Sequence, residues 1–108
     1  MNDARDPEVL RALAARIDAA PSVARRSGGV LGTAAAYLPG ERIEGLRVRD
    51  GIRLEVHVVM RWGSKVDDVE RDILEAIGSL WPPTAVDVVI DDIALSGTHE
   101  RGTDVMCR

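Results

Sequence analysis

The chain has 108 residues, a net charge of −4, 45% hydrophobic residues and 30% charged residues, which is typical of one globular domain and excludes wholesale disorder. Its one cysteine and two histidines exclude an intramolecular disulfide and a Cys/His zinc site within one chain. No apolar run approaches the roughly 20 residues of a membrane-spanning helix, and the first residues lack the apolar stretch of a secretory signal. We therefore expect a cytoplasmic protein without a cofactor or a bound metal ion.

The first predicted element is a short amphipathic helix. Asp6 is a suitable N-cap, and Pro7 fits the first helical position, where its missing N–H is not needed. Pro21 disfavours helical geometry in the residue before it and ends the element. The apolar residues that recur at helical spacing are Leu10, Leu13, Ala14 and Ile17.

Glycines interrupt residues 22–40, and this stretch is predicted to be a loop. Glycine-rich loops can bind phosphate, but the nucleotide signature needs a Lys-Ser/Thr pair after its second glycine. The stretch has no such pair, which disfavours phosphate binding.

Apolar and polar residues alternate from residue 46 to residue 62, which predicts a β-hairpin. A two-residue turn at Asp50-Gly51 would pair Arg49 with Ile52 and place charges on the apolar face. A three-residue loop, residues 49–51, pairs Val48 with Ile52 and Leu46 with Leu54, and is favoured. Gly51 then takes the left-handed backbone conformation.

A second helix is predicted after the hairpin, with Ser64 as its N-cap and Asp67 close to a capping-box position. Pro82-Pro83 ends it. Its apolar stripe is Val66, Val69, Ile73, Ala76, Ile77 and Leu80. Its wet face is Lys65, Asp68, Glu70, Arg71, Asp72 and Glu75.

A final strand is predicted at residues 86–91, with Val86, Val88 and Ile90 on one side and acidic residues on the other. The predicted fold class is therefore α+β: helix, hairpin, helix and strand, with two helices on one face of a 3–4-stranded sheet. One domain is expected over residues 1–95. Residues 96–108 lack an apolar period and are expected to form a flexible tail.

The residues that could carry chemistry do not form a catalytic or metal-binding pattern. Neighbouring carboxylates such as Asp67-Asp68 and Asp91-Asp92 point in different directions on a helix or a strand. His57 lies on the polar face of the hairpin near Glu55, and no nucleophile or base partner accompanies it. We expect an ordinary half-exposed histidine and a protein that is not an enzyme.

Charge is divided unevenly along the chain. Residues 21–61 contain seven arginines against four acidic residues, whereas residues 62–95 contain two basic residues against eight acidic ones. The candidate interaction residues are Arg47, Arg49, Arg53 and Arg61 on the hairpin and Asp68, Glu70, Asp72 and Glu75 on the second helix.

This distribution of charge is compatible with two functions. Opposite charges on opposite sides of a domain favour head-to-tail self-association. Alternatively, the arginines form the face of a small RNA-binding or ribosome-associated module. Sheets that read RNA usually stack bases on exposed aromatic residues, and this polar face has none. Nucleic acid is therefore an unlikely partner.

Several short sequence segments, in their order and spacing along the chain, resemble the alkaline-shock or general-stress (Asp/Gls-type) family of bacterial envelope stress response proteins. The similarity runs from about residue 8 to residue 93 and includes no catalytic motif. The sequence departs from the family pattern at Trp62, where Tyr is common, and at Asp87, where Asn is common. The strings are Ser27-Gly28-Gly29, residues 45–48, residues 52–59, Trp62-Gly63 and residues 86–93.

The resemblance implies a small cytoplasmic, non-enzymatic protein. Such a protein gathers at the inner face of the cell envelope through a membrane-anchored partner and through self-assembly into homo-oligomers. The resemblance supplies no ligand, cofactor, metal or active-site residue. Because the sequence has neither a spanning segment nor a polybasic cluster, we expect no direct insertion into the membrane.

Overall fold

The computed structural model describes residues 6–29, 32 and 34–95, and it confirms the α+β fold class. The helices are α1 (Pro7–Asp18) and α2 (Val66–Ile77). The strands are β1 (Val23–Arg26), β2 (Ala35–Leu38), β3 (Glu41–Glu44), β4 (Leu46–Arg49), β5 (Arg53–Arg61) and β6 (Val86–Ala94). Two short 3-10 turns, Gly78–Leu80 and Pro83–Ala85, connect α2 to β6.

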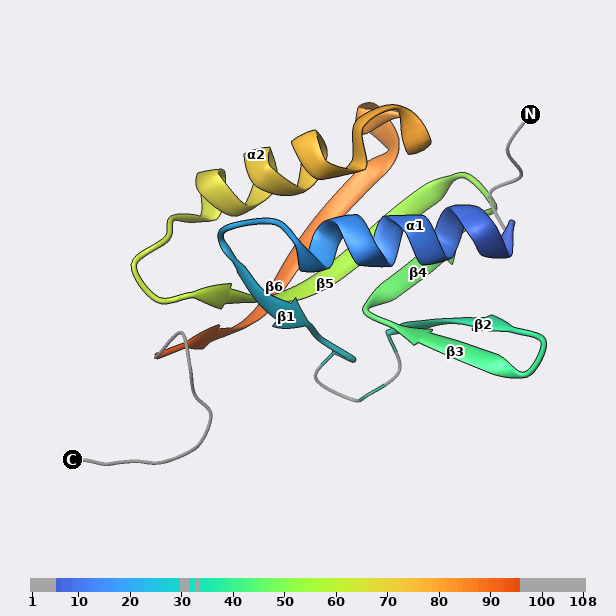
Figure 1. Cartoon of the computed structure of the whole chain (residues 1–108), viewed down its shortest axis with the longest axis horizontal. Coiled ribbons are helices and arrows are strands. Elements are labelled where there is room, and N and C mark those ends of the chain that lie inside the picture. The colour runs from blue at the N-terminus through green and yellow to red at the C-terminus, as the bar shows by residue number, and fades with distance from the viewer. Residues whose placement is uncertain (1–5, 30–31, 33, 96–108) are drawn as a thin grey trace.

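Strand β5 is the centre of the main sheet. Strands β4 and β1 pair antiparallel with β5, β4 along its first half and β1 along its second half. Strand β6 pairs parallel with β5 over nearly its whole length. Strands β2 and β3 form a separate two-stranded hairpin, which lies beside the N-terminal half of α1 (Figure 1).

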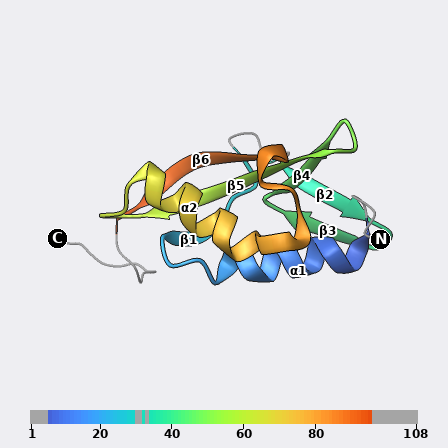
Figure 2. The same ribbon diagram turned by 90° about the horizontal axis from the view of Figure 1, so that it is seen from above.

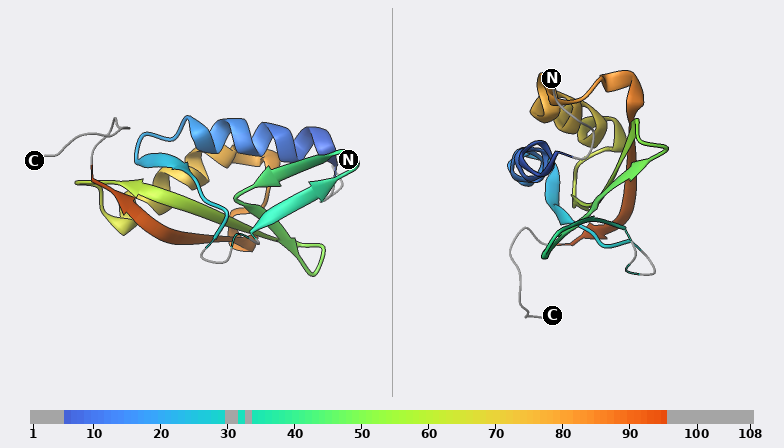
Figure 3. Two further views of the ribbon diagram at one scale, coloured as in Figure 1. Left: turned by 90° about the horizontal axis from the view of Figure 1, so that it is seen from below. Right: turned by 90° about the vertical axis from the view of Figure 1, so that its right-hand side faces the viewer.

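Both helices cover the same face of the main sheet, as the view from above and the end view show (Figures 2 and 3). The core lies between these two layers. Side chains alternate between the two faces of β5, and those on the helix side belong to this core. They pack there against the buried apolar residues of both helices. The largest fully buried residues are Leu10, Leu13, Ile17, Val23, Leu46, Leu54, Val56, Val58, Val69, Ile73 and Ile77.

Helix α1 follows the sequence prediction. The Asp6 carboxylate accepts a hydrogen bond of 2.9 Å from the Glu8 backbone N–H, and Pro7 occupies the first helical position. Leu10, Leu13, Ala14 and Ile17 are buried, as the periodicity predicts.

Helix α2 differs from its prediction at both ends. It begins after Lys65 rather than Ser64, and Asp68 accepts a 3.0 Å hydrogen bond from the Lys65 backbone N–H. Val66 therefore lies in the first turn beyond the core, and it is exposed rather than part of the apolar stripe. The helix ends at Ile77, before Pro82-Pro83, because its C-cap residue Gly78 adopts a positive φ of 57°. No helix of the described residues is long and apolar enough to cross a membrane.

The prediction that residues 22–40 form a loop is wrong. The stretch contains β1 and β2, and β2 continues through a turn at Pro39-Gly40 into β3, which the sequence pattern did not predict. Each of these strands has only four residues. Four residues show too few alternations for a period of two to be recognised on their own. Strand β4 is equally short, but its alternation continues across the turn into β5.

The register of the β4–β5 hairpin also differs from its prediction. Val48 pairs with Leu54 rather than with Ile52, and Leu46 pairs with Val56 rather than with Leu54. The loop does have three residues, but it comprises residues 50–52. A shift of two residues keeps the paired strand residues on their predicted faces. Ile52 is the exception, because it lies in the loop and is 67% exposed instead of packing on the apolar face.

Two left-handed residues make this turn possible. The Ile52 backbone N–H donates to the Arg49 carbonyl at 3.1 Å, and Asp50 and Gly51 have φ of 56° and 74°. These φ values are those of a type I′ turn. The predicted positive φ at Gly51 is confirmed.

Gly45 occupies the point where β4, β1 and the β2–β3 hairpin meet. Its N–H donates to the Ala34 carbonyl and its carbonyl accepts from the His57 N–H, both at 2.8 Å. A Cβ atom here would lie 2.7 Å from the Arg26 Cβ and 3.1 Å from the His57 carbonyl oxygen. The junction therefore requires glycine for space as well as for its φ of 90°.

We predict that Gly51→Ala lowers the free energy of unfolding by about 1–2 kcal/mol, because an alanine is strained at positive φ. A Cβ at Gly51 meets nothing within 4 Å, so conformational strain is its only cost. Gly45→Ala should cost more, since it adds a clash with backbone and Cβ atoms to the same strain. Urea unfolding of both variants, with the exposed Ile52→Ala as a control, measures the difference. Equal stability of the two glycine variants would contradict the tight junction at Gly45.

Candidate functional site

The polar face of the main sheet, opposite the helices, carries both signs of charge. Register places Arg47 beside Glu55, and Glu55 beside Asp87. The prediction of an arginine-dominated sheet face is therefore incomplete. Parallel pairing of β6 brings acidic side chains next to the arginines of β4 and β5.

Two of the four predicted interaction arginines are held in ion pairs on this face. Arg53 binds Asp87 with both arms of its guanidinium, at 2.9 and 2.7 Å, and this contact lowers the pKa of Asp87 below its usual range. Arg49 contacts Glu55 at 3.2 Å. Arg61 donates to the Pro21 carbonyl at 2.9 Å, and Arg47 is exposed without an ion pair among the described residues.

His57 is enclosed between two carboxylates rather than half-exposed. Its Nε2 lies 2.8 Å from Glu55 Oε1, and its Nδ1 lies 3.2 Å from Asp91 Oδ2. The three side chains are only 14%, 12% and 10% exposed for His57, Glu55 and Asp91. The sequence places Glu55 near His57 on the same strand face. It gives no sign of Asp91, which lies beside His57 only because β6 pairs parallel with β5.

This cluster ties β6 to β5. A neutral imidazole has one N–H and can donate to only one of the two carboxylates, whereas an imidazolium can donate to both. The hydrogen bond from His57, with a smaller contribution from Arg49, lowers the pKa of Glu55 below its usual range. Both ring nitrogens are occupied, and the carboxylates lie on opposite sides of the ring. Within the described residues, no group of three His, Cys, Asp or Glu side chains is arranged to hold a metal ion.

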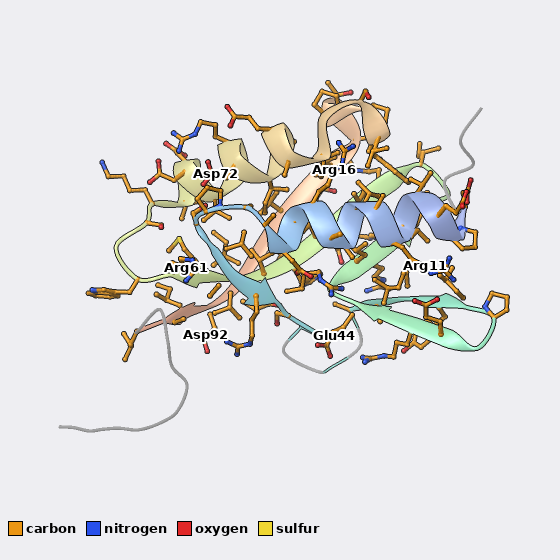
Figure 4. All side chains as sticks on the ribbon, in the orientation of Figure 1. Arg11, Arg16, Glu44, Arg61, Asp72 and Asp92 are labelled. Carbon is orange, nitrogen blue, oxygen red and sulfur yellow. The ribbon has the colours of Figure 1, made fainter. Side chains whose placement is uncertain are left out.

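Asp72 is buried, which corrects its assignment to the wet face of the second helix. Its Oδ2 accepts hydrogen bonds from the Ser22 hydroxyl at 2.6 Å and from the Ser22 backbone N–H at 3.2 Å. Figure 4 shows Asp72 on α2 beside the turn that follows α1. The hydroxyl contact, assisted by Arg71, lowers the pKa of Asp72 below its usual range. Asp72 therefore anchors α2 to this turn and is not available to a partner.

The other acidic interaction residues of α2 divide into two kinds. Glu70 and Glu75 are exposed, as predicted. Asp68 is half-buried, because its carboxylate caps the helix and also contacts Arg71 at 3.3 Å. The predicted opposition of an acidic helix and a basic sheet is thus much weaker than the sequence suggests.

Exposed apolar side chains gather at one end of the sheet, where β5 and β6 both finish. The Trp62 backbone N–H donates to the Ala94 carbonyl at 2.9 Å, which places Trp62 beside the last residues of β6. Trp62 is 67% exposed and Leu95 is 77% exposed. We call this set the apolar end: Trp62, Val66, Ile93 and Leu95.

A hollow lies toward the other end of the molecule. It has a volume of about 530 Å³ and is enclosed by the start of α1, by β2 and the turn after it, and by β4. Arg47 is the one charged residue that lines it, and Tyr37, also in the lining, is exposed. The other lining residues are Pro7, Leu10, Ala35, Ala36, Leu38, Pro39 and Val48.

Neither surface was predicted from the sequence. An aromatic residue directly after a strand, followed by Gly63, was the available signal for the apolar end. The hollow had no signal, because it is built partly by β2, which was predicted to be a loop.

Comparison of the chain with protein-family models, characterised proteins and solved structures finds no match. The resemblance to the alkaline-shock or general-stress family therefore stays a prediction. The α+β fold is the class that the structure itself defines.

We predict that His57→Ala lowers the free energy of unfolding by about 1.5–3 kcal/mol, because it removes the imidazole between two enclosed carboxylates and so removes a hydrogen-bond donor from that site. Arg47→Ala, on the same face but exposed, should change it by less than about 0.5 kcal/mol. Chemical denaturation at neutral pH measures both. Two variants of equal stability would show that the cluster does not hold β6 in place.

We predict that Asp72→Asn destabilises the protein at pH 7 and that this loss diminishes in acid. The folded state lowers the pKa of Asp72, so the carboxylate stabilises the fold above its unfolded pKa of about 4, and this contribution is lost as pH falls through the folded value. Ser22→Ala should follow the same pH dependence. Urea unfolding at pH 7 and pH 3 tests this, and a difference from wild type that stays constant with pH would contradict it.

Proposed function

We propose that this protein is a non-enzymatic interaction protein of the cell envelope, of the kind its sequence resembles. It gathers at the inner face of the membrane through a membrane-anchored protein partner and through contacts between its own copies. The proposal comes from the resemblance, and the apolar end supports the part that concerns protein binding.

The apolar end carries this argument because exposed apolar side chains are informative when they are contiguous. Single exposed apolar residues are normal on protein surfaces, whereas a group that includes an aromatic residue typically marks an interaction site. Trp62 directly follows β5, Ile93 lies in the neighbouring β6, and Leu95 directly follows β6. Val66 begins the helix that leaves the same end. Tryptophan is also the residue that most often dominates binding energy at protein interfaces.

An RNA-binding module, the alternative, has less support. Arg53 and Arg49 are committed to Asp87 and Glu55, so a phosphate backbone would have to compete with these ion pairs. The polar face also carries the enclosed Glu55–His57–Asp91 cluster, whose two carboxylates repel phosphate.

The location of the tagged full-length protein in its own cell tests the proposal. We expect the wild type at the envelope, and we expect Trp62→Ala to disperse into the cytosol because its partner-binding side chain is removed. Ile52→Ala is a matched control, since Ile52 is also 67% exposed but lies at the tip of the β4–β5 hairpin. Wild-type protein spread evenly through the cell would contradict the proposal.

Vesicles distinguish a protein partner from direct membrane binding. We expect the purified protein to bind neither neutral nor anionic vesicles appreciably, because direct binding needs an apolar helix face or a polybasic cluster. Co-sedimentation with vesicles of both compositions measures this. Tight binding to either would remove the need for a membrane-anchored partner, and salt-sensitive retention on immobilised RNA would favour the alternative function.

A further inference from the structure

We propose that this protein binds an extended peptide segment of another protein, which pairs antiparallel with the free edge of β4 in the hollow. The segment carries an aliphatic residue between two acidic residues. The inference goes beyond the proposed function, because it concerns the hollow rather than the apolar end and uses no contact between copies of the chain.

Strand β4 has one free edge. Among the strands that the structure describes, it pairs only with β5. The Gly45 carbonyl accepts a hydrogen bond from the His57 N–H of β5. Because the direction of the backbone groups alternates along a strand, the N–H and the carbonyl of Arg47 also face β5, whereas those of Val48 face away from it. Val48 therefore presents one donor and one acceptor at the free edge.

The hollow lies against this edge. Strands β4 and β2 diverge from the point where β3 continues into β4 (Figures 1 and 3). Val48 and all four residues of β2 line the hollow between them. Strand β2 pairs only with β3 within the described part of the chain, so its other edge is unpaired too. An extended peptide that binds in the hollow lies between two unpaired strand edges, which is the setting for recognition by strand addition.

The side chains of β4 determine which peptide residues fit. Residues directly opposite each other on neighbouring strands share a face of the sheet, and successive residues alternate between the faces. The peptide residue opposite Val48 points to the helix side, where Leu10 and Leu38 also line the hollow, so an aliphatic side chain suits this position. Its two neighbours lie opposite Arg47 and Arg49, which are exposed. Acidic side chains suit these two positions.

Arg47 is the stronger of the two attractions. Arg49 already contacts Glu55 at 3.2 Å. Arg47 lines the hollow and has no ion pair within residues 6–29, 32 and 34–95, so it can bind a carboxylate without breaking an existing contact.

The same two arginines disfavour pairing between two copies of β4. Antiparallel copies with Val48 opposite Val48 would place Arg47 opposite Arg49, and like charges directly opposite each other are destabilising. Short strands with charged side chains are a common protection of a sheet edge against pairing with itself. The edge therefore selects an acidic strand and disfavours a second copy of itself.

The probe for the test is a synthetic peptide, Thr-Glu-Val-Glu-Thr, with both ends blocked. Two control peptides each remove one feature. Lysine in place of glutamate reverses the charge, and N-methylation of the valine removes the N–H that donates to the Val48 carbonyl. On the protein, Arg47→Ala removes the exposed guanidinium at the hollow. Arg25→Ala, at an exposed arginine of β1, is the matched control.

An NMR titration of the isotope-labelled full-length protein gives both the affinity and the location of binding. We expect the glutamate peptide to shift the amide signals of residues that line the hollow, and to slow hydrogen exchange of the Val48 amide at least about ten-fold at saturation. Arg47→Ala should raise the dissociation constant about three- to ten-fold, and Arg25→Ala should leave it unchanged. The lysine and N-methylated peptides should bind at least about ten-fold more weakly than the glutamate peptide.

Several results would overturn the inference. Equal affinity for the N-methylated peptide, or a Val48 amide that exchanges as fast as before, would show that the peptide does not pair with β4. Octanoate has a carboxylate and an aliphatic chain but no peptide backbone. If octanoate shifts the signals of the hollow and the peptide does not, the hollow is a site for small aliphatic acids. Absence of binding by every probe would also overturn the inference.

The proposed function fails or succeeds separately from this inference. Peptide binding is measured on the purified protein, whereas the proposed function is tested by location in the cell. Wild-type protein that is dispersed in the cell but binds the glutamate peptide would contradict only the proposed function. Protein at the envelope that binds no peptide would contradict only the inference.

Discussion

Strand β5 is the constraint on which the rest of the structure depends. Two short strands, β4 and β1, share one of its edges end to end, and β6 takes the other edge. Both strands can pair with the same edge of β5 because Gly45, at the point where they meet, has no side chain to clash with Arg26 or His57. His57, on β5 at this same point, contacts Asp91 on β6. One short segment of β5 therefore joins both edges of the sheet.

The same arrangement explains why the sheet face is not the basic surface that the hairpin sequence suggests. Parallel pairing aligns β6 with β5, so Asp87 reaches Arg53 and Asp91 reaches His57. Charges that look available in the sequence are used to hold the sheet together. Exposed apolar groups remain at the apolar end, and Arg47 remains exposed at the hollow. These surfaces support the proposal that the protein acts by binding other proteins, including its own copies.

Local patterns predicted the elements that are long enough to show a period. The cap at Asp6, the buried stripe of α1, the alternation of β5 and the left-handed Gly51 are all confirmed. The four-residue strands β1, β2 and β3 were missed because, unlike β4, none of them continues the alternation of a longer neighbouring strand. Contacts between distant segments, such as Ser22 with Asp72 or His57 with Asp91, depend on tertiary packing and strand order. No local pattern in one sequence encodes them, and this is why the candidate interaction residues were only partly right.

Hydrogen exchange of individual backbone amides tests the central role of β5 most directly. Amides that open only with global unfolding exchange slowest, and a two-stranded hairpin opens more easily than a strand with two paired edges. We expect the β5 amides to be the most protected among the described residues, followed by those of β6 and β4, and we expect those of β2 and β3 to exchange well before global unfolding. Protection of β2 and β3 equal to that of β5 would contradict it.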